Sequence, residues 1–196
     1  MEDFKRYCGK AHEQMLILLW VTQRLKSRQD DENSDVAHAV SAIEQDFIEW
    51  GLEFRQRIDF RFDKGDGLLI LASPLIVGGV ESIRRIDVEH DRDNIINYLD
   101  NQLDDFLRPM INIATTLEPY HGEPRPSNWT LVRRLRNSLS HFRYEYDPDS
   151  GDIRFEDFNN QGAQTMNLTI PLISVLDLAY RFGRESVGWA QRNGHY

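Results

Sequence analysis

Apolar residues recur at helical spacing over most of this chain, which restricts the fold to one built mainly from helices. Similar stripes predict helices over residues 3–27 and 35–59, the second of them capped by Ser34. Between residues 92 and 117 a third stripe steps by three or four positions, as in two packed helices. Its members are Ile96, Leu99, Leu103, Phe106, Met110, Ile113 and Leu117. Pro109 predicts a kink in this helix because proline removes one backbone donor.

Three segments of the first half do not fit a helical stripe. The polar stretch 27–34 and the sequence KGDG at 64–67 predict loops. Residues 68–80 are apolar and are broken by one proline and two glycines. They are compatible with a buried helix, a covering loop or a contact between subunits.

The second half changes from a helical to a strand period. A connector at 118–128 contains three prolines, and Ser127 or Asn128 caps the helix that follows it to about residue 141. The apolar stripe of that helix is Val132, Leu135, Leu139 and Phe142. Aromatic and charged residues then alternate, and a turn at 147–151 predicts a β-hairpin, with 166–170 as a possible third strand. Pro171 opens the last helix, whose inward residues are Leu172, Val175, Leu176, Ala179 and Phe182.

The predicted fold is therefore mainly α: a helical bundle with a small β-hairpin before the last helix, forming one domain over residues 1–196. A chain of 196 residues suits one domain. Its single cysteine, Cys8, excludes an internal disulfide framework and a thiolate zinc site. We expect a cytoplasmic protein without a membrane partner. The first ten residues are charged where a signal peptide would be apolar, and no apolar run reaches the roughly 20 residues of a membrane span.

One basic window interrupts an otherwise acidic chain. The net charge is −9, which argues against a protein that coats nucleic acid with its whole surface. Between Pro124 and Tyr144, however, there are five arginines and no acidic residue. Arginine binds phosphate through two donors at once, and aromatic neighbours such as Trp129 and Tyr144 can stack on bases. The simpler interpretation of the same window is a solvated helix face beside ordinary core aromatics.

Within this window, Arg136-Asn-Ser-Leu-Ser-His141 resembles the R-x4–6-H motif of HEPN domains, in which a polar residue commonly follows the arginine. The resemblance implies an all-α bundle with the motif on a late helix. It also implies a metal-independent endoribonuclease, often a toxin of a toxin–antitoxin or abortive-infection system. Such proteins work as homodimers whose two motifs face each other, and a protein antitoxin is a possible further partner.

Two other arginine–histidine pairs have the same kind of spacing, so the motif alone is weakly specific. They are Arg85 with His90 and Arg6 with His12. The first is surrounded by acidic residues that would repel a phosphate, and the second lies near the chain start with a glycine inside it. Only residues 136–141 combine a polar second residue, a basic window and a two-faced helix.

The chemistry of RNA cleavage without a metal indicates a role for each candidate. The 2′-hydroxyl attacks the adjacent phosphorus, which requires a base, an acid and donors to the phosphate oxygens. We assign His141 as general base or acid, Arg136 as phosphate clamp and Asn137 as the residue that orients the substrate or the histidine. No metal or cofactor is expected, and the products are a 2′,3′-cyclic phosphate and a 5′-hydroxyl. The expected RNA-binding residues are Arg133, Arg134, Ser140, Arg143 and Tyr144.

Helix geometry predicts that this site is completed by a second subunit. At 100° per residue, Arg133, Asn137 and His141 form one stripe, which Arg136 and Ser140 flank. Arg136 and His141 lie about 140° apart on a straight helix. They can therefore hold one group only at a helix end or between two subunits, which agrees with the homodimer that the resemblance implies.

Three other interpretations stay open. The first is a non-catalytic HEPN-type module that binds RNA, a nucleotide or a protein partner. The second is a di-metal bundle, because a carboxylate and a histidine are three residues apart at 35–38 and again at 87–90. Such a bundle needs further inward glutamates, and the sequence does not set Glu44 and Glu49 in register with these pairs. The third is a scaffold without a site. Some HEPN toxins carry a tyrosine two residues after the histidine that an antitoxin modifies. Here that position is Arg143, so this form of neutralisation is not expected.

Overall fold

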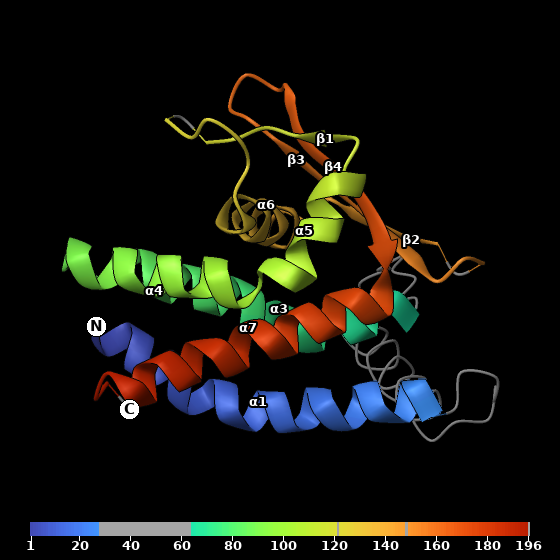
Figure 1. Ribbon diagram of the computed structural model, residues 1–196. Helices are drawn as coiled ribbons and strands as arrows, with labels where there is room; N and C mark the ends of the chain where they lie inside the picture. Colours follow the sequence, from blue (N-terminus) through green and yellow to red (C-terminus); the bar gives the residue numbers. More distant parts are fainter. Residues whose placement is uncertain (28–63, 121, 148, 196) are drawn as a thin grey trace, which may run out of the picture.

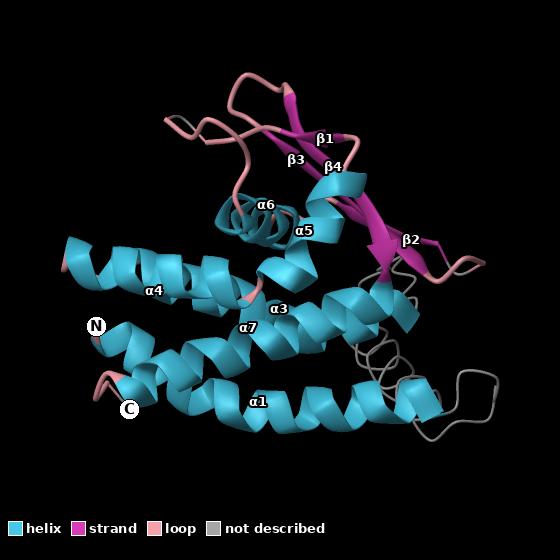
Figure 2. Cartoon of the chain, in the orientation of Figure 1, coloured by secondary structure: helices cyan, strands magenta, loops and turns pink. Residues whose placement is uncertain are grey.

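The computed structural model describes residues 1–27, 64–120, 122–147 and 149–195. These residues are mainly helical and carry one small antiparallel sheet (Figures 1 and 2). The helices are α1 (Glu2–Ser27), α3 (Lys64–Arg84), α4 (Glu89–Gln102), α5 (Asp104–Ile113), α6 (Asn128–Ser140) and α7 (Leu172–Arg192). The helix predicted over 35–59 lies outside the described residues. Within them, no helix is long and apolar enough to cross a membrane.

Helices α1, α3 and α7 pack against one another and form the base of the molecule (Figure 1). The two ends of the chain meet there, and the rings of Phe4 and Trp189 lie 6.0 Å apart. Gly79 permits the close approach of these helices. A Cβ atom at this position would collide with the ring of Phe182 and the hydroxyl of Tyr7. The two adjacent glycines, Gly78 and Gly79, therefore lie within a continuous α3, and Gly79 allows its neighbours to pack closely.

The segment 68–80, left ambiguous by the sequence, is the body of α3, and the KGDG predicted as a loop belongs to the first turns of the same helix. Burial explains why helix forms in spite of one proline and four glycines, since tertiary packing overrides weak local propensity. Six apolar residues of α3 are almost completely buried: Leu69, Ala72, Leu75, Ile76, Val80 and Ile83.

The long helix predicted over 92–117 is two helices, and the break is at Leu103 and not at Pro109. Asn128 explains the position of the break. Its side-chain amide donates to the carbonyl oxygen of Asp100 at 2.8 Å, which a continuous helix would have used internally, and to Asp104 Oδ1 at 2.8 Å. Leu99, Leu103 and Met110 of the predicted seam are buried, as expected. Ile95 and Leu107 are buried as well, whereas Ile113 of the predicted seam is exposed.

The sheet has four strands in the order β1-β4-β3-β2, and all neighbours are antiparallel. The strands are β1 (Thr116–Leu117), β2 (Tyr144–Asp147), β3 (Asp152–Phe158) and β4 (Gln164–Pro171). Strands β2 and β3 occupy the segment where the sequence predicts a hairpin, with Tyr144 opposite Phe155. The possible third strand at 166–170 is present within β4, which pairs along β3. The chain after α5 adds β1, and the sequence did not indicate this fourth strand.

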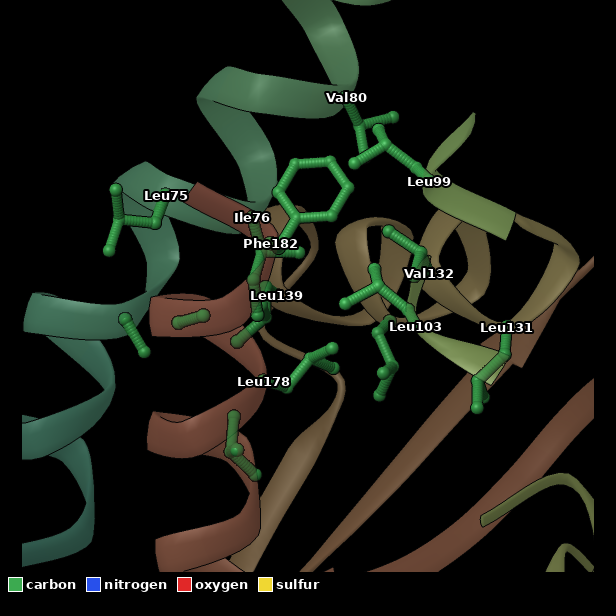
Figure 3. Close-up of a cluster of buried hydrophobic side chains, with 14 of the residues drawn as sticks. Leu75, Ile76, Val80, Leu99, Leu103, Leu131, Val132, Leu139, Leu178 and Phe182 are labelled. Atoms are coloured by element: carbon green, nitrogen blue, oxygen red, sulfur yellow. The ribbon is translucent and has the colours of Figure 1, made fainter. Parts of the chain in front are cut away.

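Helix α6 lies between the sheet and the helical base, and contacts β3 on one side and α3 on the other (Figure 2). It begins with a capping box in which Ser127 Oγ accepts from the amide of Thr130 at 3.1 Å and Thr130 Oγ1 accepts from the amide of Ser127 at 3.2 Å. Asp100 Oδ1 accepts from the amide of Trp129 at 2.8 Å. Apolar side chains of α6 pack among those of α3, α4 and α7 (Figure 3). This burial holds the C-terminal turn of α6 in place.

Candidate functional site

The C-terminal turn of α6 is closed by a Schellman motif. The amide of Arg143 donates to the carbonyl of Ser138 at 2.9 Å, and the amide of Phe142 donates to the carbonyl of Leu139 at 3.4 Å. Phe142 has the left-handed φ of 53° that this motif requires, and its side chain is 81% exposed. His141 is therefore the last residue of the turn and is exposed to solvent. The sequence predicted that Phe142 belongs to the buried stripe of α6. This prediction is wrong, because the chain has already left the helix at Phe142.

Arg136 is held by two side chains. Its guanidinium forms an ion pair with Glu81 of α3, and Nη1 donates to Asn137 Oδ1 at 2.7 Å. The Arg136 side chain is 18% exposed, and its Nε is buried without a hydrogen-bond partner in the described part of the chain. The motif arginine is consequently oriented by these two side chains before any ligand binds.

Asn137 continues this chain of contacts to the sheet. Its side-chain amide donates to Asp157 Oδ2 at 3.2 Å. The side chain of Asp157 is only 1% exposed, and the same oxygen accepts from Arg134 Nη1 at 2.9 Å and from Thr165 Oγ1 at 3.2 Å. Asp157 therefore joins α6 to β3 and β4 directly below the motif.

Arg134 differs from the sequence expectation that it contacts RNA. It is buried, and it also donates to Thr165 Oγ1 at 2.7 Å and to the carbonyl of Glu118 at 3.3 Å. A guanidinium with these partners has no face for a phosphate. We assign Arg134 to the structural support of the site, since a buried charge requires this kind of pairing.

A hollow of about 650 Å³ opens beside the motif. Asn137, His141, Arg143 and Asp157 line it from the α6 side and from β3. Phe158 at the end of β3 and Asn159, Asn160 and Gly162 of the β3–β4 turn complete its lining. The side chain of Arg143 is 39% exposed, and its Nη1 lies 3.8 Å from Asp157 Oδ1. The hollow thus brings together a histidine, an exposed arginine and side-chain amides.

The remaining predicted RNA-binding residues are distributed around this hollow without lining it. Ser140 is exposed. Arg133 lies over the ring of Tyr120, with its guanidinium carbon 3.7 Å from the ring centroid. Burial raises the pKa of Tyr120, and the charges of Arg133 and Arg134 oppose that rise. Tyr144 is half-buried in β2, with its ring 6.3 Å from that of Phe155. Its ring is therefore packed on the sheet.

The described residues give little support to the other candidate sites, which are the Arg85–His90 pair, a metal centre and Cys8. Arg85 pairs with Asp3 at 3.5 Å, and His90 is exposed on α4, outside the site. Among the described residues, no group of three side chains is arranged to hold a metal ion. The other residues of the di-metal interpretation, 35, 38, 44 and 49, lie outside the described part. Burial raises the pKa of Cys8 to about 12, which opposes its use as a nucleophile.

Sequence reasoning missed two carboxylates of the site, Glu81 and Asp157. A signal existed for Asp157, because it continues the inward positions of Ile153 and Phe155 in an alternating strand. An acid on the buried face of a strand requires a cationic partner. No comparable signal existed for Glu81, which comes 55 residues before Arg136 and meets it only through the packing of α3 on α6.

Comparison with known proteins gives one match. A family model described as HEPN pEK499 p136 matches residues 66–185. This range begins in α3 and ends in α7, and it includes every residue of the network from Glu81 to Asp157. No curated protein and no solved structure matches the chain.

Proposed function

Because the chain belongs to the HEPN pEK499 p136 family, we propose that it is a metal-independent endoribonuclease of the HEPN type. One observation carries this proposal: exposed His141 lies at a hollow that Asn137 and Arg143 also line, and Arg136 is tied to Asn137. The function class that fits is a toxin or abortive-infection effector. It acts on RNA in the cytoplasm.

The proposed reaction assigns each residue a task. The imidazole of His141 takes the proton of the ribose 2′-hydroxyl, whose oxygen bonds to phosphorus while the bond to the 5′-oxygen breaks. A second histidine returns a proton to that leaving oxygen. Each terminal nitrogen of Arg136 carries two N–H groups and has one acceptor among the described residues, so the remaining N–H groups can stabilise the charge on the phosphate oxygens. Asn137 forms hydrogen bonds with both Arg136 and Asp157, so it orients the Arg136 guanidinium that clamps the phosphate.

A homodimer supplies the second histidine in this proposal. One copy of the motif provides one exposed histidine, whereas the reaction needs a base and an acid. Apposition of two motifs across a two-fold axis places both copies of His141 and Arg136 at one phosphate. The C-terminal turn of α6, where His141 is exposed, is the surface that would meet its counterpart.

A specific contact favours a second candidate, a non-catalytic RNA-binding module. The ion pair with Glu81 occupies the motif arginine in the free chain. A guanidinium that is held in this way can support the fold without contacting a reacting phosphate. Such a module would still bind RNA through Arg143 and His141.

The test is RNA cleavage in excess EDTA by the wild type, by His141→Ala and by His90→Ala. His90 is the matched control because it is an exposed histidine in a second arginine–histidine pair of the same spacing. We expect His141→Ala to lose roughly 100-fold or more of the rate, the size of a general acid–base contribution, and His90→Ala to retain it. The products should carry a 2′,3′-cyclic phosphate and a 5′-hydroxyl.

Each other outcome has a clear meaning. Equal rates in all three proteins would place the activity elsewhere. Binding of RNA that is retained without cleavage would select the binding module.

A further inference from the structure

Part of the lining of the hollow lies outside the motif and supplies an aromatic ring and side-chain amides. It is formed by Phe158, where β3 ends, and by the turn through residues 159–162 that leads into β4. General acid–base chemistry and phosphate clamping use only the α6 side of the hollow. The aromatic ring and the amides of the turn therefore have no task in the proposed reaction.

Arg143 and Phe158 form a stacked pair at this part of the lining. The guanidinium carbon of Arg143 lies 5.3 Å from the centroid of the Phe158 ring, within the range of a cation–π contact. The backbone of Arg143 is held on both sides, since its amide donates to Ser138 and its carbonyl accepts from the amide of Glu156 at 3.0 Å. Asp157 lies 3.8 Å from the same guanidinium. The planar group is thus backed by a ring and fixed at its edge, and 39% of the side chain remains exposed.

The β3–β4 turn carries two asparagines, Asn159 and Asn160, whose side chains differ in their hydrogen bonding within the described residues. Asn159 Oδ1 accepts from the amides of Gln161 and Ala163, both at 3.0 Å, so this side chain holds the turn together. Asn160 is exposed, and its side-chain amide makes no hydrogen bond within the described residues. One side-chain amide therefore remains available as both donor and acceptor at the rim of the hollow.

We propose that this hollow is a subsite for one unpaired nucleobase of RNA, which stacks on the guanidinium of Arg143 and meets Asn160 with its edge. The inference rests on the proposed function for the phosphate that lies next to it at His141. A flat cationic surface backed by an aromatic ring is the type of surface on which bases stack. The volume of about 650 Å³ falls within the roughly 300–1,000 Å³ typical of small-molecule sites.

The subsite predicts the class of substrate. A base inside a duplex cannot reach a stacking surface without leaving its helix, so single strands, loops and bulges are favoured. The exposed charge at the opening comes from Arg143, because the carboxylate of Asp157 is buried and paired with Arg134. Both points favour an unpaired nucleotide as the occupant, and RNA follows from the proposed function.

The test measures the binding of ten-nucleotide RNAs whose 2′-oxygens are methylated, so that attack by the 2′-hydroxyl is blocked. Affinities of wild type and Arg143→Lys for the single strands and for a matched duplex are obtained by fluorescence anisotropy. Lysine retains the positive charge but lacks the planar face. Arg154→Lys is the matched control, because Arg154 is an exposed arginine of β3 that pairs with Glu145 at 2.6 Å and does not line the hollow.

We expect Arg143→Lys to weaken single-strand binding about tenfold, the effect of losing one base stack, and to change duplex binding little. Arg154→Lys should bind as the wild type does. Asn160→Ala should reduce the difference in affinity among the A, C and U single strands. Thermal melting of each variant checks that the fold is retained.

The outcomes separate this inference from the proposed function. Wild-type binding by Arg143→Lys, or an equal loss for single strand and duplex, would overturn the subsite even if the protein cleaves RNA. Stack-dependent binding without cleavage would support the subsite and overturn the nuclease. A wild type that neither binds nor cleaves overturns both.

Discussion

At the residue scale, the most unusual position is Phe142. A Schellman motif ordinarily has glycine where the backbone turns left-handed, because a Cβ atom is strained there. Phe142 adopts a φ of 53° at that position, between His141 and Arg143, and its ring is 81% exposed. The ring recovers little stability through burial. The backbone bonds of the motif, and not the side chain, hold this conformation.

Phe142→Gly is therefore expected to stabilise the protein by about 1 kcal/mol relative to Phe142→Ala, because only glycine adopts this φ without strain. The two variants lose the same exposed ring, so their difference isolates the backbone term. Urea unfolding monitored by circular dichroism measures both. Equal stabilities would show that the turn relaxes to another conformation.

At the scale of elements, the site depends on how α6 is joined to the sheet. Asp157 of β3 binds Arg134, Asn137 and Thr165, so one buried carboxylate connects a helix and two strands. Removing one partner of a buried ion pair leaves the other charge without compensation. The support of the motif is consequently more sensitive to mutation than the exposed residues that are proposed to contact RNA.

Asp157→Asn should lower the free energy of unfolding by about 3 kcal/mol, because Arg134 would retain a buried charge without its counter-ion. Glu145→Gln is the control from the same sheet. It breaks the exposed pair with Arg154 and should cost less than about 1 kcal/mol. Chemical denaturation of the two variants gives the comparison. A small effect of Asp157→Asn would mean that water solvates the guanidinium of Arg134 in place of the lost carboxylate.

At the scale of the whole molecule, the proposed reaction requires two copies of the chain. A single motif offers one exposed histidine, and its arginine is already held by Glu81. Two copies would supply a base and an acid, together with two clamps, at the same phosphate. Activity should then be a property of the dimer.

Specific activity is expected to fall on dilution in parallel with the fraction of dimer. Sedimentation velocity gives that fraction over the same concentration series in which RNA cleavage is measured. The physical reason is that dissociation removes one of the two histidines. Full activity of a monomer would contradict the shared site while leaving the nuclease itself in place.

The sequence by itself determined the helical class, the family and the position of the motif. These depend on local periodicity and on six residues that are close together along the chain, from Arg136 to His141. It also identified the capped start of α6, because capping is a local interaction. The same local reasoning was wrong for KGDG and left residues 68–80 undecided, because burial against α1 and α7 stabilises a helix in α3 that glycine and proline disfavour.

Only the tertiary structure decided what surrounds the motif. Glu81 meets Arg136, and Asp157 meets Arg134, through contacts between elements that are distant in sequence. These contacts bury Arg134, which was predicted to bind RNA, as a structural support, and they orient Arg136, the predicted phosphate clamp, before any ligand binds. The break at Leu103 is decided in the same way, by the side chain of Asn128. Charge pairing and burial depend on three-dimensional proximity, which periodicity along a chain does not contain.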